Sequence, residues 1–177
     1  TGHADCPLLR FGAPGRADLL RRLKTVVDEV DAELSARFGT SLSAANTTVK
    51  PSGDSSELFG CAAGASARFA QFAIRRVREN KSSPIASFLI AQGVPHETAM
   101  EDDKLWAFAF PKKAPEGATL RDDMTAIDQL NNWLEWKRCW AEHSVSVSVY
   151  VKDHEWPAVQ AWVWEHFDEV SGIALFP

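Results

Sequence analysis

Residues 144–151 read Ser-Val-Ser-Val-Ser-Val-Tyr-Val, which is the clearest strand pattern in the chain. Side chains alternate between the two faces of a strand, so the four valines point to one face and the polar residues to the other. An apolar helical pattern follows at 157–167, and Gly172 precedes a further apolar run at 173–176. A strand, a helix and a strand in this length are close to the minimum for one parallel crossover. We therefore predict an α/β fold in which helices cover a sheet.

The rest of the chain repeats this alternation of helical and extended patterns. Apolar residues recur at three- and four-residue steps over 17–38, and Gly39 is suited to end that helix. Helices are also predicted over 84–92 and 122–143, with Ser83 capping the first and His143 near the end of the second. Strands are predicted over 44–50, 72–78 and 105–110, the last ended by Pro111.

Composition indicates one ordinary globular domain covering residues 1–177. Hydrophobic residues make up 45% of the chain and charged residues 24%. The net charge of -5 argues against a nucleic-acid partner, which would require a basic surface. Arg75, Arg76 and Arg78 form a tight basic cluster, which is either a solvated face or a phosphate-facing one. No apolar run approaches the roughly 20 residues that span a bilayer, so no membrane partner is expected.

The cysteines and histidines do not form a recognisable site. Cys6, Cys61 and Cys139 are far apart, which gives neither a disulfide framework nor zinc-ligand spacing. The five histidines are also scattered, so no metal site is predicted. We expect a reducing, cytoplasmic location and assign no catalytic residue.

One segment has the shape of a chemical site. Residues 47–57 combine a β-branched run, a Pro-Ser-Gly turn and a helix start, where free backbone N–H groups and the helix dipole attract anions. Gly53 allows close approach of a phosphate, and the serine hydroxyls can donate hydrogen bonds. An ordinary turn with Asp54 capping the short helix would have the same pattern, and a carboxylate that faced a phosphate would repel it. The candidate phosphate-binding residues are Ser52, Gly53, Asp54, Ser55 and Ser56.

The same segment resembles the phosphate loop of adenosylcobalamin-dependent ribonucleoside-triphosphate reductases, the class II ribonucleotide reductases. Further segments resemble that family in the same order, so the resemblance covers roughly Arg16 to Pro177. The segments that carry it are 47–56 (Thr-Thr-Val-Lys-Pro-Ser-Gly-Asp-Ser-Ser), 74–78 (Ile-Arg-Arg-Val-Arg), 110–118 (Phe-Pro-Lys-Lys-Ala-Pro-Glu-Gly-Ala), 121–130, 144–151 and 172–177.

This resemblance implies the later part of a ten-stranded α/β barrel with its helices packed outside the strands. It implies reduction of ribonucleoside triphosphates to deoxyribonucleotides, the precursors for DNA replication, by a cysteine radical that adenosylcobalamin generates. The family's catalytic cysteine motifs are absent, and Cys61 and Cys139 fall outside them. The chain is therefore expected to supply the phosphate loop and to be inactive alone. Its implied partners are the nucleotide substrate and the rest of the reductase, as one chain or as a complementary subunit; residues that contact the cofactor are not identified.

Two departures from the family pattern leave other functions open. The family often has Gly-x-His-Pro-Arg-Tyr where residues 64–69 read Gly-Ala-Ser-Ala-Arg-Phe, and Glu57 replaces a commonly apolar residue. The alternatives are a non-catalytic nucleotide- or phosphate-binding module and a truncated remnant of a reductase. Part of a barrel would also expose sheet edges and an uncovered apolar face, which favours assembly or aggregation.

Overall fold

The computed structural model describes residues 1–177, and their contacts divide the chain into two compact units. Unit 1 consists of residues 1–69 and 115–177, and unit 2 consists of residues 70–114. The single domain that composition indicates for residues 1–177 stays a prediction.

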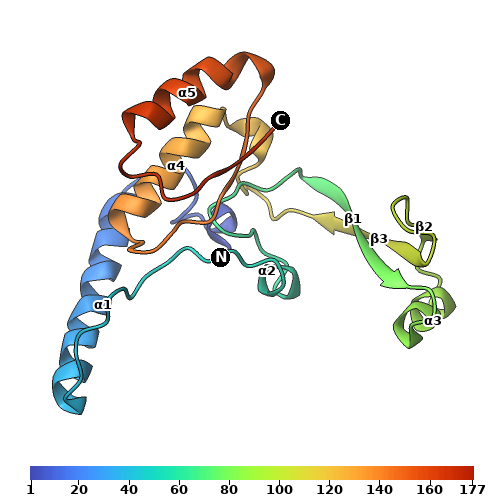
Figure 1. Ribbon diagram of the computed structural model, residues 1–177, viewed down its shortest axis with the longest axis horizontal. Coiled ribbons are helices and arrows are strands. Elements are labelled where there is room, and N and C mark those ends of the chain that lie inside the picture. The colour runs from blue at the N-terminus through green and yellow to red at the C-terminus, as the bar shows by residue number, and fades with distance from the viewer. The chain divides into compact units, whose positions relative to one another are not determined.

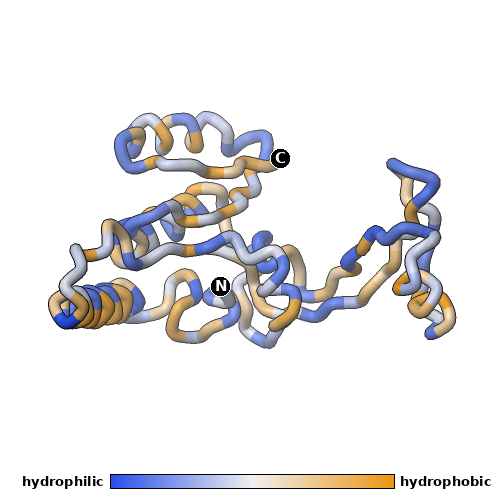
Figure 2. The backbone as a smooth tube through the Cα atoms, turned by 60° about the horizontal axis from the view of Figure 1, so that its bottom comes forward, coloured by the Kyte–Doolittle hydropathy of each residue, from blue (hydrophilic) through white to orange (hydrophobic).

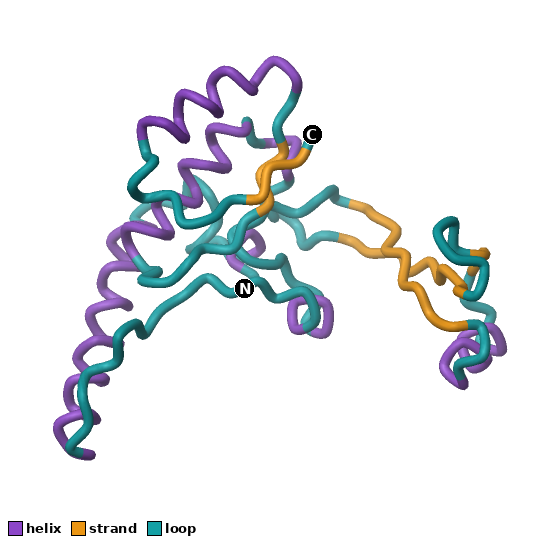
Figure 3. Tube along the Cα trace, viewed as in Figure 1, coloured by secondary structure: helices purple, strands orange, loops and turns teal.

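Unit 1 is a layer of helices (Figure 1) packed against two short parallel strands, which Figure 3 shows in orange. The helix α4 lies between α1 and α5 and contacts β4 (Figures 1 and 3). The elements of this unit are the 3-10 turns His3–Asp5, Arg121–Asp123 and Asp153–Glu155, the helices α1 (Arg16–Phe38), α2 (Ser55–Leu58), α4 (Ala126–Cys139) and α5 (Trp156–Glu165), and the strands β4 (Ser148–Tyr150) and β5 (Ala174–Phe176).

The alternating valines lie in the core of unit 1, as predicted. Val145, Val147, Val149 and Val151 are all buried, and they pack in one cluster with α4 and α5. Trp133 of α4 is fully buried among them, and its indole N–H donates to the Val145 carbonyl at 3.0 Å. This bond satisfies a polar group that burial would otherwise leave unpaired.

The predicted crossover is confirmed. β4 and β5 pair in parallel, with Val149 opposite Leu175, and α5 connects them. The strand predicted over 44–50 is reduced to extended chain in which only Val49 forms a bridge, parallel to Val145. The regular part of the strand predicted over 144–151 is likewise limited to β4.

The bounds predicted for α4 were wrong at both ends. Thr125 caps the helix: its hydroxyl accepts from the Asp128 N–H at 3.1 Å, and its own N–H donates to the Asp128 carboxylate at 2.9 Å. This reciprocal pair starts the helix at Ala126, not at residue 122. The helix ends at Cys139, because the N–H groups of residues 142 and 143 turn to the Thr47 carbonyl. His143 therefore lies outside the last turn.

Unit 2 is an antiparallel sheet with one helix. β1 (Phe72–Asn80) pairs with β3 (Leu105–Lys113) over its full length, and β2 (His96–Thr98) pairs with the other edge of β3. The helix α3 (Pro84–Ala91) begins as predicted, with the Ser83 hydroxyl accepting from the Ile85 N–H. β2 was not predicted, because three residues give no periodic signal.

Pro111 does not end β3, contrary to the prediction. The Ala109 N–H donates to the Pro95 carbonyl on the β2 side of β3. Successive N–H groups alternate between the two edges of a strand, so position 111 faces the β2 side as well, beyond the last residue that β2 pairs. A missing N–H costs little at an unpaired edge, and the pairing with β1 continues to Lys113.

Two arginines of the basic cluster form ion pairs within unit 2. Arg76 lies 3.1 Å from Glu97, and Arg78 pairs with Glu101, all four side chains being largely exposed. Their charges are thereby partly neutralised, as on a solvated face. No helix of either unit combines the length and the apolar character that crossing a membrane requires.

Gly64 is the glycine that unit 1 depends on most. Its φ is +53°, and a Cβ at this position would lie 2.5 Å from the Ser146 carbonyl oxygen. The neighbouring Ala65 N–H donates to that same oxygen at 2.7 Å, so the two chain segments cannot separate without losing the bond. Gly60 has a similar φ of +65° but open space around it.

We expect Gly64→Ala to lower the free energy of unfolding by roughly 2 kcal/mol more than Gly60→Ala. Both changes place a side chain at positive φ, which costs about 1–2 kcal/mol, and only the first creates a backbone clash. Urea unfolding followed by circular dichroism measures the difference. Equal losses in the two variants would contradict the close approach at Gly64.

Candidate phosphate loop

The predicted phosphate loop follows the carboxyl end of the extended segment that contains Val49. That segment runs parallel to residues 144–151, and ligands of parallel α/β folds bind beyond the carboxyl ends of the strands. The loop enters the short helix α2, and its five candidate residues differ in exposure. Gly53, Asp54 and Ser55 are exposed, whereas Ser52 and Ser56 are buried.

The two buried serines are engaged inside the protein. The Ser52 and Thr1 hydroxyl oxygens lie 2.5 Å apart and share a hydrogen bond. The Ser56 hydroxyl donates to the Ser52 carbonyl, and the Ser56 N–H donates to the same oxygen at 2.9 Å. These groups stabilise the bend rather than face a ligand.

The outward side of the loop presents unpaired donors. The N–H groups of Gly53, Asp54 and Ser55 donate no hydrogen bond within the chain, and the Ser55 hydroxyl is exposed. Asp54 makes no side-chain cap, contrary to the prediction, because its own φ and ψ of -89° and -51° are already helical. Its exposed carboxylate brings a negative charge to the same side.

The N-terminal segment holds the far side of the loop, which the sequence did not reveal. The Gly2 N–H and the Thr1 hydroxyl both donate to the Ala62 carbonyl, at 2.8 and 2.7 Å. The Ala62 N–H donates in turn to Asp5, whose carboxylate forms a bidentate pair with Arg68 at 2.8 Å. Arg68 belongs to the segment that departs from the family pattern, and it still has a structural partner.

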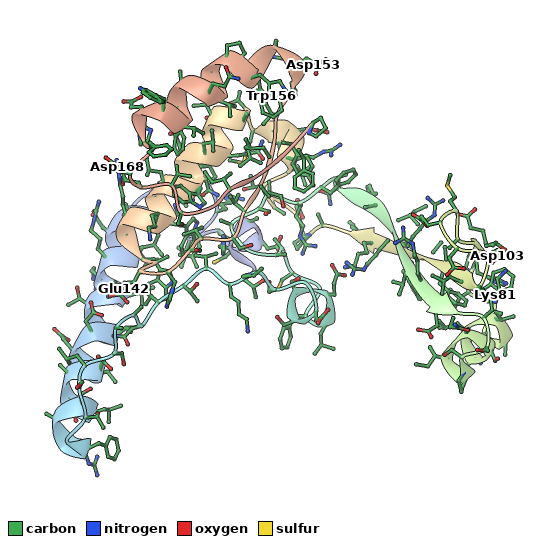
Figure 4. The ribbon with its side chains drawn as sticks, viewed as in Figure 1. Lys81, Asp103, Glu142, Asp153, Trp156 and Asp168 are labelled. Atoms are coloured by element: carbon green, nitrogen blue, oxygen red, sulfur yellow. The ribbon has the colours of Figure 1, made fainter.

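Glu142 fixes the segment that leads into the loop (Figure 4). Its carboxylate accepts from the Asn46 N–H at 2.5 Å and from the Lys24 ammonium of α1 at 3.0 Å. These bonds lower the pKa of Glu142 below its ordinary value, and the bond from the Asn46 backbone has the largest effect. The Glu142 carboxylate, just after the end of α4, thus links α1 to the segment around Asn46 that leads into the loop.

A cavity of about 430 Å³ reaches the start of the loop at Pro51. It is bordered on its other sides by Thr48, residues 143–147, Gly172 and Ala174, and it includes none of residues 52–56. Leu58 and Phe59, directly after the loop, are 82% and 75% exposed, which is unusual for large apolar side chains. Within this chain the loop is therefore an open surface.

All three cysteines are free thiols in this chain. Cys139 is buried in the core of unit 1, and Cys6 and Cys61 are half-buried near the N-terminal segment. The Cys61 thiol lies 3.8 Å from the Thr1 hydroxyl. No group of three or more His, Cys, Asp or Glu side chains is arranged to hold a metal ion.

The fold of the chain matches part of the fold of a class II ribonucleotide reductase. The crystal structure of a B12-dependent (class II) ribonucleotide reductase matches 91% of this chain with a TM-score of 0.80 at 23% sequence identity. The match covers 23% of that solved chain. No protein-family model matches the sequence.

The homologues of the chain are adenosylcobalamin-dependent ribonucleoside-triphosphate reductases, which confirms the resemblance inferred from the sequence. The reductase of Lactobacillus leichmannii is 24% identical over 164 residues, which is 90% of this chain and 22% of the relative. That of Levilactobacillus brevis is 25% identical over 160 residues, 88% of this chain and 21% of the relative. A probable reductase of Dictyostelium discoideum is 27% identical over 124 residues, 70% of this chain and 16% of the relative. The chain thus spans about a fifth of the length of these relatives.

His3, beside the N-terminal residues that hold the loop, is a buried titratable group that the sequence did not single out. Its side chain is 5% exposed and packs on Trp136 with the ring centroids 4.3 Å apart. Its Nε2 has no hydrogen-bond partner. Burial, together with the positive N-terminus and Arg16, lowers the pKa of His3 to about 3.

We expect the free energy of unfolding of unit 1 to decrease as the pH is lowered from about 6.5, because of His3. The unfolded chain binds a proton near that pH, whereas the folded chain stays neutral until about pH 3. Unfolding therefore takes up a proton between these values, and the free energy of unfolding decreases by about 1 kcal/mol from pH 7 to pH 5.5. In a His3→Phe variant, which keeps a ring against Trp136, this decrease should disappear. Urea titrations at both pH values test it, and an equal decrease in both proteins would contradict the assignment.

Proposed function

We propose that the chain is a segment of an adenosylcobalamin-dependent ribonucleotide reductase and that it supplies the loop that binds the substrate phosphates. In this proposal unit 1 contributes the later strands of a ten-stranded barrel, with its helices outside. The complete enzyme converts ribonucleoside triphosphates to deoxyribonucleotides. The chain by itself is inactive, and the substrate site is completed by the remaining part of the reductase.

The observation that carries the proposal is the set of free donors on the exposed side of the loop. Three consecutive N–H groups, those of Gly53, Asp54 and Ser55, have no acceptor in the chain and lie beyond the end of a parallel segment. A phosphate has several acceptor oxygens that can occupy such a row of donors. The matching loop sequence in the reductase family supports the same role.

We propose different tasks for the five candidate residues. Gly53 and Ser55 would contact phosphate through backbone N–H groups and the Ser55 hydroxyl. Ser52 and Ser56 would hold the bend in shape through their internal hydrogen bonds. The exposed carboxylate of Asp54 would weaken anion binding unless a cation or a hydrogen-bond donor of the missing part faces it.

No residue of this chain is proposed to hold adenosylcobalamin. Its larger open cavities, of about 230–430 Å³, are too small for that cofactor, and none of them is bordered by a cysteine. Cys139 is sealed in the core, so it cannot reach a substrate without unfolding. The cofactor and the radical cysteine are therefore assigned to the remaining part of the enzyme, and no step of the chemistry is derived from residues of this chain.

Nucleotide binding tests the loop. We expect each ribonucleoside triphosphate to bind the chain, with Ser55→Ala weakening binding about fivefold through the loss of one hydrogen bond. Asp54→Asn should strengthen binding, because it removes a charge that repels phosphate. Isothermal calorimetry at fixed, low ionic strength measures both effects.

Ser87→Ala is the matched control, since Ser87 is an exposed helical serine of unit 2. It should leave binding unchanged. If wild type, Ser55→Ala and Ser87→Ala bind equally, the loop is not the phosphate site.

A further inference from the structure

The second half of α1 extends past its packing partners within unit 1. The helix has 23 residues, and its contacts with α4 are made near its beginning (Figure 1). There Leu20 is 2% exposed and belongs to the core, and Arg16 forms a bidentate pair with Glu135. From residue 26 onward no other helix covers α1.

This uncovered half carries an apolar stripe. Positions three and four residues apart share one face of a helix, so the core row that begins at Leu20 continues along the same side. Hydrophobic positions alternate with hydrophilic ones along α1 (Figure 2). The exposed members, named here the α1 stripe, are Leu23 (43%), Val26 (55%), Val30 (47%), Leu34 (41%) and Phe38 (70%).

The chain's own returning segment packs on a different side of α1. Asp31 accepts from the N–H and the hydroxyl of Ser43, at 3.0 and 2.6 Å, and the Ser35 hydroxyl donates to the Ser41 carbonyl. Each residue turns an α-helix by about 100°, so positions 31 and 35 face a different side of α1 from Leu23, Val30 and Leu34. The returning segment thus covers a polar side and leaves the stripe open.

The length of the homologous reductase indicates which polypeptide covers the α1 stripe. The matched reductase structure reproduces 91% of this chain, and more than three quarters of that solved chain lies outside the match. The stripe is continuous with the core of unit 1 at Leu20, so whatever covers it extends this same core. A large, contiguous apolar surface of this kind is rare on monomers and marks an interaction site.

We infer that the α1 stripe is the docking surface for the remaining part of the reductase fold, which would cover it with an apolar face. The inference rests on the proposed function and adds where on this chain the complementary polypeptide binds. The interaction is hydrophobic, so it should withstand high salt, unlike a contact made by charges.

The test uses the Lactobacillus leichmannii reductase from which the 164 matched residues have been deleted, co-expressed with this chain. We expect a 1:1 complex in size-exclusion chromatography with light scattering, at both 0.1 and 1 M salt. The Val30→Asp, Leu34→Asp double variant should reduce the complex at least tenfold. Both side chains are exposed in the free chain, so circular dichroism of the isolated variant should be unchanged.

The matched control is the Ala32→Asp, Ala36→Asp variant, which adds the same two charges to exposed positions on the opposite side of α1. It should retain the complex. The absence of a complex with the wild-type chain, or an equal loss in both double variants, would overturn the inference. So would a wild-type homodimer that only the stripe variant dissociates, because the occupant would then be a second copy.

The two proposals fail separately. A complex that depends on the stripe but binds no nucleoside triphosphate would reject the phosphate loop and leave the docking surface intact. Nucleotide binding that depends on Ser55, without any complex, would reject the docking surface alone.

Discussion

Unit 1 depends on one row of valines and the tryptophan that closes over it. Val145, Val147, Val149 and Val151 present one continuous apolar face, and Trp133 both fills the space above it and bonds to its backbone. Because the row belongs to the strand that pairs with β5 and bridges to Val49, it also sets the positions of the crossover and of the segment that enters the phosphate loop. Hydrophobic packing thus sets where the candidate site lies in unit 1, and the hydrogen bonds of Ser52 and Ser56 set the shape of its bend.

The elements that the sequence predicted are those whose signal is local. The period of α1, the cap at Ser83 and the alternation over 144–151 are each contained in a short window. The errors arose where distant residues decide. α4 ends early because its following N–H groups turn to Thr47, and β3 passes through Pro111 because the neighbouring strand has already ended. Neither partner can be identified from the residues next to the boundary.

The sequence predicts the candidate site only in part, for the same reason. The spacing predicts the loop but does not distinguish its serines, and only the fold separates the exposed Ser55 from the buried Ser52 and Ser56. Thr1, more than fifty residues away, holds the Ser52 hydroxyl inward, and the Ser52 carbonyl holds the Ser56 hydroxyl. A serine hydroxyl is equally suited to either role, so its chemistry alone does not predict which one it takes.

The core and the surface of unit 1 differ in how completely their apolar side chains are covered. The early turns of α1, the valine row and α4 bury enough side chains to define unit 1, while Leu58, Phe59 and the outer half of α1 leave large apolar groups in water. Selection for a soluble monomer would replace such groups with polar ones, since exposed positions tolerate polar substitution at little cost in stability. Their presence beside the candidate phosphate loop is therefore consistent with a surface that another polypeptide covers. The same covering would remove water from the loop, which strengthens hydrogen bonds between its free N–H groups and a phosphate.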